Sequence, residues 1–108
     1  MIWDRILRSV GEYWGASRSS KWPAVRRNFV KLNPYCAACG TTKELEVHHI
    51  IPFHIEPARE LDTANLMTLC QDCHFFIGHL KDWTRHNPHA PDDAALMLSR
   101  FSQTSQQL

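Results

Sequence analysis

Two pairs of cysteines share the same local spacing, as Cys36-Ala-Ala-Cys39 and Cys70-Gln-Asp-Cys73. A Cys-x-x-Cys turn aims two thiolates at one point, and two such turns complete the tetrahedral sulfur shell that zinc prefers. A redox motif would need a thioredoxin-like βαβ pattern, which the sequence lacks. We expect a cytoplasmic protein, because no signal-peptide pattern opens the chain, and thiols stay reduced in that compartment. We therefore predict a closed, structural zinc site made of the four cysteines.

Three histidines stand close to these turns. His48 and His49 are adjacent, and His74 directly follows Cys73. Neighbours on a regular strand point to opposite faces, so both can serve one centre only if the chain bends, and Pro52 favours a bend. A zinc ion on Cys73 would fix the backbone there and so aim His74. Neutral imidazoles accept protons near pH 7 and bind divalent cations, so this set is suited to metal-assisted hydrolysis.

The elements that must position these residues are short. Alternating polarity predicts a strand over residues 44–49, and residues 65–69 form a second strand candidate after a polar loop over 52–64. Apolar residues at helical spacing predict four helices: residues 2–14; Ser20 as N-cap to Asn33; His74 through Phe76 and Leu80 to Trp83; and Pro91 through Ala94, Met97, Leu98 and Phe101. The polar residues 102–108 are expected to fray.

The length and composition of the chain are those of one small globular domain. The chain has 108 residues, of which 44% are hydrophobic and 21% charged. So short a chain buries a thin core, which a bound metal would help to stabilise. Residues 1–35 hold seven basic and two acidic side chains, whereas residues 36–108 hold five basic and nine acidic ones. The basic segment is suited to a polyanion, although a solvated helix face accounts for it equally well. No apolar run is long enough to span a membrane, so we expect no membrane partner.

The residues around the histidines resemble the HNH endonuclease family. The similar segments are Val47-His48-His49-Ile50-Ile51-Pro52, Asn65-Leu66 and Leu69-Cys70-Gln71-Asp72-Cys73-His74. They are most similar to the zinc-stapled branch, in which a ββα-metal (His-Me finger) hairpin lies between two Cys-x-x-Cys turns. The resemblance covers roughly residues 36–80 and implies a ββα-metal core. Together with the predicted N- and C-terminal helices, which lie outside the resemblance, this core makes an α+β fold. We divide the single domain into a basic helical extension (1–35), a nuclease core (36–85) and a C-terminal helix with a frayed tail (86–108).

The resemblance also implies roles for individual residues. His48 and His74 would bind one divalent cation, which could be Mg²⁺, Mn²⁺, Ni²⁺ or Zn²⁺. His49 would be the general base that activates water for hydrolysis of a DNA phosphodiester bond. Asn65 would tie the loop across the hairpin and orient His49.

One position departs from the family pattern. Some members carry another histidine one helical turn after the last motif histidine, and here that position is Gly78, followed by His79. We interpret His79, and also His54, as surface or hydrogen-bonded histidines, and a role as a third ligand or a phosphate contact stays open for both. Gly78 would let a phosphate backbone approach the helix. Glu46 is interpreted as an exposed strand carboxylate.

The expected partner is DNA, and RNA stays open as a substrate. Phosphate contacts are expected from six basic residues: Arg18, Lys21, Arg26, Arg27, Lys31 and Lys43. No second DNA-reading motif is present, so specificity would come from a homodimer or from a larger phage or mobile-element assembly. The alternative function is a non-enzymatic zinc-knuckle module that binds nucleic acid or serves an assembly. Such a module has no use for His48, His49 and His74 together with Asn65.

Overall fold

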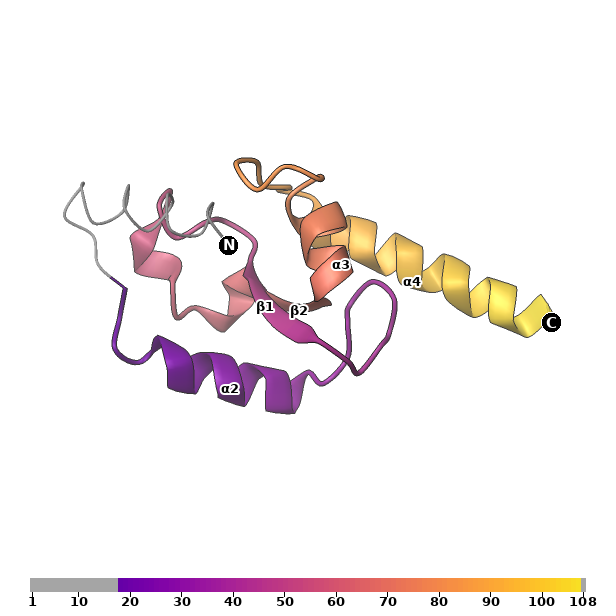
Figure 1. The fold of residues 1–108 in the computed structure, drawn as a ribbon, viewed down its shortest axis with the longest axis horizontal. Helices are drawn as coiled ribbons and strands as arrows, with labels where there is room; N and C mark the ends of the chain where they lie inside the picture. Colours follow the sequence, from indigo (N-terminus) through magenta and orange to yellow (C-terminus); the bar gives the residue numbers. More distant parts are fainter. Residues whose placement is uncertain (1–17, 108) are drawn as a thin grey trace.

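The computed structural model describes residues 18–107, and the helix predicted over residues 2–14 lies outside them. A two-stranded hairpin forms the centre, with one helix before it and two after it (Figure 1). In chain order the main elements are α2 (Trp22–Leu32), β1 (Leu45–His49), β2 (Leu66–Cys70), α3 (Gln71–Cys73), the π-helical turn η3 (His74–Gly78) and α4 (Ala90–Gln107). Two 3-10 turns, η1 (Pro57–Arg59) and η2 (Thr63–Asn65), lie in the loop that joins the strands.

The two strands pair in antiparallel fashion and lead straight into α3. His49 lies opposite Leu66, and Leu45 lies opposite Cys70 at the other end. All five residues of β2 are buried, and Leu69 is 0% exposed. The α+β class and the ββα order are therefore confirmed, with both strands within one residue of their predicted positions.

Helix α2 precedes the hairpin and packs against β1. Its N-cap is Lys21, so the prediction of Ser20 was wrong. Ser19 organises this turn instead, because its carbonyl accepts from the Trp22 N–H at 3.2 Å and its hydroxyl accepts from the Lys21 N–H at 3.1 Å. Pro23 stands in the first turn, where its missing N–H costs nothing, and the helix gives way to Asn33 as predicted.

The helix predicted from His74 to Trp83 ends early, so this prediction was wrong. The single turn of α3 widens into η3, and the chain then leaves the helix. Leu80 and Lys81 take left-handed backbone angles, with φ of 54° and 64°. The Lys81 N–H reaches back to the Phe75 carbonyl at 3.0 Å and closes this wide turn. Phe76, which belongs to the apolar spacing of the predicted helix, is 53% exposed.

Helix α4 begins at Ala90 and runs away from the hairpin towards the C-terminus (Figure 1). Ala90 and Ala94 are buried against the cysteine turns, whereas Leu98 and Phe101 are exposed. The helix continues through residue 107 and so includes most of the segment expected to fray. No helix in the described part of the chain is long and apolar enough to cross a membrane.

Candidate metal centres and active site

The four cysteines converge as predicted. One sulfur atom from each of Cys36, Cys39, Cys70 and Cys73 lies within 4.8 Å of the others. The Cys39 and Cys70 Sγ atoms are 3.7 Å apart. Four sulfurs around zinc at about 2.3 Å would be separated by about 3.8 Å, the edge of that tetrahedron. The cluster is therefore the right size for a tetrahedral metal.

Backbone amides are turned towards these sulfurs. The Ala38 and Cys39 N–H groups donate to Cys36 Sγ at 3.4 Å, and the Cys73 N–H donates to Cys70 Sγ at 3.5 Å. Burial raises the pKa of the Cys36 thiol, but hydrogen bonds from backbone amides outweigh burial and lower the pKa to about 7. All four cysteines are free thiols rather than disulfides. This donor set fits a structural metal.

A second cluster consists of His48 on β1, His74 on η3 and His79 just beyond it. One ring nitrogen from each lies within 4.8 Å of the others. The ring centroids are 4.9 Å apart for His48 and His74, 5.1 Å for His48 and His79, and 4.9 Å for His74 and His79. Three imidazoles around one point are a common ligand set for a divalent cation.

Hydrogen bonds to the outer ring nitrogens set the tautomers of two of these histidines. His79 Nδ1 lies 2.7 Å from the Arg85 carbonyl, which only accepts, so Nδ1 carries the proton. His74 Nδ1 lies 3.4 Å from a Glu46 carboxylate oxygen and donates in the same way. The two Nε2 atoms then face each other with lone pairs at 3.3 Å. Two facing lone pairs repel unless a cation or a proton lies between them.

His48 completes the cluster from the hairpin side. Its side chain is 2% exposed, and no group in the described part of the chain forms a hydrogen bond with its buried Nε2. Burial, followed by the neighbouring imidazoles of His74 and His79, lowers the pKa of His48 to about 2. A neutral, buried imidazole without a partner is the state that a metal requires of a ligand. The three histidines therefore fit a divalent cation.

The π-helical turn explains why His79 belongs to this cluster. A π turn brings residues five apart into line, whereas an α-helix would bring Gly78 into line with His74. His79, which we expected as a surface or hydrogen-bonded histidine, is hydrogen-bonded and half-buried beside His74. Gly78 does not open a path for a phosphate, because the His48 ring fills the space above it. A Cβ at this position would lie 3.0 Å from His48 Cε1.

Two further side chains support the cluster and were not assigned to it from the sequence. The Trp83 ring lies 4.8 Å from the His79 ring and 5.3 Å from the His74 ring. Glu46 contacts His74, whereas we had interpreted it as an exposed carboxylate. Its alternation with His48 on β1, which places both on one face of the strand, is the signal that could have identified it.

His49 lies outside the three-histidine cluster but lines the same cavity of about 220 Å³. Its Nε2 is 2.9 Å from the Glu60 carbonyl, so Nε2 carries the proton and Nδ1 keeps its lone pair. Burial lowers the pKa of His49, which keeps the ring neutral at pH 7. The Trp22 ring covers it with the centroids 4.4 Å apart. Neither Glu60 nor Trp22 was assigned to the site from the sequence.

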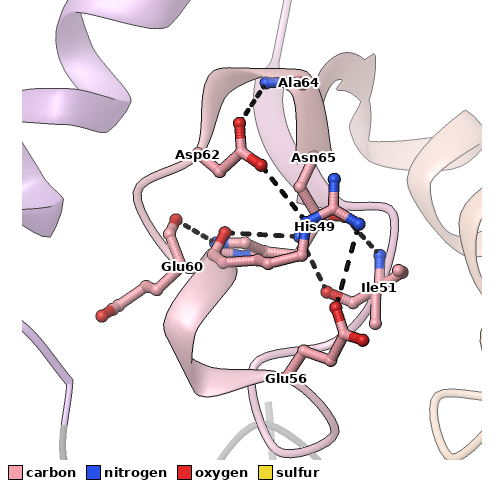
Figure 2. A network of polar contacts seen from close by, with 8 residues as sticks. His49, Ile51, Glu56, Glu60, Asp62, Ala64 and Asn65 are labelled. Atoms are coloured by element: carbon pink, nitrogen blue, oxygen red, sulfur yellow. Dashed lines mark hydrogen bonds and ion pairs between the residues drawn. The ribbon is translucent and has the colours of Figure 1, made fainter.

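Asn65 ties the loop across the hairpin, as Figure 2 shows. Its side chain is 1% exposed and pairs with both backbone groups of Ile51, accepting from N–H at 2.8 Å and donating to C=O at 3.0 Å. A longer contact of 3.4 Å joins it to the Arg59 carbonyl. These contacts of Asn65 are with backbone groups of Ile51 and Arg59, so its effect on the His49 ring passes through the loop that carries Glu60.

The predicted phosphate-binding residues separate into two groups. Arg18 and Arg26 line the cavity, and so does His54, whose pKa is lowered by burial. The remaining four are exposed and do not line it: Lys21, Arg27, Lys31 and Lys43. The lining of the cavity thus combines arginine and histidine side chains, a composition that suits a phosphate.

Comparison with known proteins adds one match. The family model described as HNH endonuclease matches residues 35–75, which span both strands, four of the five histidines that line the cavity, and all four cysteines. The matched histidines are His48, His49, His54 and His74, whereas His79 lies outside the match. No curated protein and no solved structure matches the chain.

Proposed function

Because residues 35–75 form an HNH endonuclease domain, we propose that this protein is a metal-dependent endonuclease that hydrolyses phosphodiester bonds of DNA. The observation that carries the proposal is the meeting of His48, His74 and His79 around one point, with the buried Nε2 of His48 lacking a hydrogen-bond partner in the described chain. A binding module that needs only the four cysteines does not account for that unpartnered nitrogen.

In this proposal His48 and His74 hold the divalent cation, and we add His79 as a third ligand. When bound, the cation would stabilise negative charge on the phosphoryl oxygens and on the leaving 3′-oxygen. Three protein ligands leave further positions open, in contrast to the closed shell of four cysteines. Glu46 and the Arg85 carbonyl hold the outer nitrogens of His74 and His79, which keeps both Nε2 lone pairs directed inward.

His49 acts as the general base. Its Nδ1 takes the proton from the attacking water, while its Nε2–H stays bonded to the Glu60 carbonyl. Because the pKa of His49 lies below the usual value, Nδ1 is unprotonated at neutral pH and available as an acceptor. Asn65 holds the loop that carries this carbonyl and is a positioning residue rather than a catalytic one.

The substrate phosphate would enter the cavity that the histidines line together with Arg26. The exposed basic residues of α2 and Lys43 would contact neighbouring phosphates and make binding depend on salt. One site of this size cuts both strands only as a homodimer or by two successive nicks. RNA offers the same phosphodiester chemistry and is the substrate to compare with DNA.

Plasmid nicking with Mg²⁺, Mn²⁺, Ni²⁺ or Zn²⁺ tests this function. We expect metal-dependent cleavage by the native protein and a loss of at least about 100-fold in His49→Ala. If the folded native protein binds DNA but cleaves with none of these metals, the non-enzymatic zinc-knuckle module is the correct alternative. If His49→Ala cleaves as fast as the native protein, His49 is not the base.

A further inference from the structure

The segment just before α2 contacts the loop that holds His49, although it lies outside the matched residues 35–75. The Arg18 guanidinium pairs with the Glu60 carboxylate at 3.4 Å, and the Ser19 N–H donates to its other oxygen at 3.0 Å. Glu60 is only 4% exposed, so this carboxylate is buried with both oxygens engaged. Burying a carboxylate without such partners would cost folding free energy. The contacts with Arg18 and Ser19 therefore hold this loop against the segment before α2.

Glu60 joins this segment to the base. Its backbone carbonyl accepts from His49 Nε2–H at 2.9 Å, while its side chain holds Arg18 and Ser19. Figure 2 shows the His49 ring and the Glu60 carbonyl in this contact. Glu60 therefore contacts the edge of the His49 ring through its backbone, while Arg18 and Ser19 hold its side chain.

Trp22 holds the same imidazole from its face. The two rings are 4.4 Å apart with an interplanar angle of 36°. The Arg18 guanidinium lies 6.0 Å from the Trp22 ring and 4.5 Å from the Phe53 ring, and Phe53 is 6% exposed. The contacts among Arg18, Trp22 and Phe53 form one packed wall beside His49.

We propose that residues 18–22 are a positioning segment for the general base, in which Trp22 on the ring face and Arg18 through Glu60 keep His49 in its reactive orientation. This inference rests on the function proposed above. It also assigns Arg18 differently from the phosphate contact expected from the sequence, because its charge is already paired with a buried carboxylate. The working nuclease site then extends beyond the matched domain into the basic N-terminal part of the chain.

Single-turnover cleavage of a plasmid by Trp22→Ala and Trp22→Phe tests the role of the ring contact. A displacement of about 1 Å at a reacting group can cost about 100-fold in rate. With the Glu60 hydrogen bond retained, we expect Trp22→Ala to lower the maximal rate about tenfold and to leave the half-saturating protein concentration within about twofold. Trp22→Phe keeps a stacking ring and should recover most of the rate. Tyr35→Ala, which removes a 61% exposed aromatic side chain, should match the native protein.

The opposite effects on the maximal rate and on the half-saturating protein concentration would overturn the proposal. If Trp22→Ala keeps the maximal rate and raises only the half-saturating concentration, Trp22 is a DNA contact. If His49→Ala cleaves normally, the proposed function fails first. If His49→Ala is inactive while Trp22→Ala keeps its full rate, only the positioning role fails.

A second pair of variants keeps the test valid should Trp22→Ala unfold. Arg18→Gln removes the ion pair with Glu60, and Arg27→Gln removes the same charge from an exposed site on α2. We expect Arg18→Gln to lower the maximal rate about threefold, and Arg27→Gln to weaken DNA binding alone. Equal effects of both variants, confined to binding, would contradict the proposal.

The tautomer of His49 gives a readout that is independent of cleavage. Nitrogen-15 NMR of the native imidazoles should find His49 as the Nε2–H form, as its bond to the Glu60 carbonyl requires. Arg18→Gln should show a mixture of the two tautomers with unchanged zinc content, at a melting temperature lowered by the loss of the ion pair with buried Glu60. A pure Nε2–H form in both Arg18→Gln and Trp22→Ala would show that the segment does not hold the base.

Discussion

The four-cysteine cluster and the three-histidine cluster can each hold a metal ion, and they are built in opposite ways. The cysteine cluster uses all four of its ligands, lies against buried Leu69 and Ala94 in the core, and receives amide hydrogen bonds on its sulfurs. The histidine cluster offers three ligands and lines a cavity that Arg26 also lines. The first arrangement is suited to holding a fold together, and the second leaves room for a substrate.

The two clusters also differ in how they are placed along the chain. Each cysteine pair is local, because both members belong to one tight turn. The histidines come from β1, from η3 and from the turn after it, so they meet only when the hairpin, α3 and η3 are all formed. Because His74 directly follows Cys73, the histidine cluster depends on the backbone that the cysteines hold, so damage should spread from the cysteines to the histidines.

Cys70→Ser should have the largest effect and abolish the fold. Binding of structural zinc contributes about 10 kcal/mol or more of folding free energy, which is comparable with the entire stability of a small domain. We expect loss of a cooperative melting transition and of bound zinc by circular dichroism and metal analysis. Asp72→Asn, an exposed change in the same turn, is the control and should melt normally. A folded, zinc-free Cys70→Ser protein would contradict the structural role.

His74→Ala should separate the two sites. We expect the four-cysteine zinc and most of the melting temperature to remain, while metal-dependent cleavage falls by at least about 100-fold. His89→Ala removes an exposed histidine elsewhere and should cleave normally. Unfolding of His74→Ala would mean that the histidine cluster, too, holds the fold.

Gly78→Ala tests whether the position of the His48 ring requires a residue without a side chain in the π turn. The new methyl group would lie 3.0 Å from His48 Cε1, so the ring must shift from its position in the cluster. We expect affinity for Mn²⁺ or Ni²⁺, measured by calorimetric titration, to fall by about 10- to 100-fold with the cysteine zinc retained. Unchanged affinity would show that His48 can move without leaving the metal.

Glu46→Gln should have the smallest effect. An amide can still contact His74 Nδ1, but it lacks the charge that favours the Nδ1–H form. We expect metal affinity to fall about tenfold, at the low end for residues that support a ligand. Glu44→Gln changes an exposed carboxylate just before β1 and is the matched control. Equal affinities in the two variants would remove Glu46 from the site.

The cysteine site and the hairpin were predictable because their patterns are local. The Cys-x-x-Cys spacing determines which sulfurs meet, and alternation along Glu46, Val47 and His48 determines which side chains share a face of β1. Similarly, the pairing of Asn65 with Ile51 follows from a family resemblance in which an asparagine ties this loop.

The place of His79 was not predictable from helical spacing. A pattern at three and four residues assumes an α-helix, whereas η3 adds one residue to the turn and brings the fifth residue into line. The contacts of Trp22 and Glu60 with His49 depend on how a helix and a loop far apart in sequence come together. No local pattern in the sequence encodes such a contact.

Cys73 and His74 are consecutive residues, yet they belong to different candidate metal clusters. The position of His74 therefore depends on the position of Cys73. In the enzyme proposed here, a chelator that removes only an ion on the cysteines would abolish hydrolysis as completely as one that removes an ion on the histidines. Inhibition by a chelator consequently says little about which ion left, and the two are told apart only by counting the metal retained per chain.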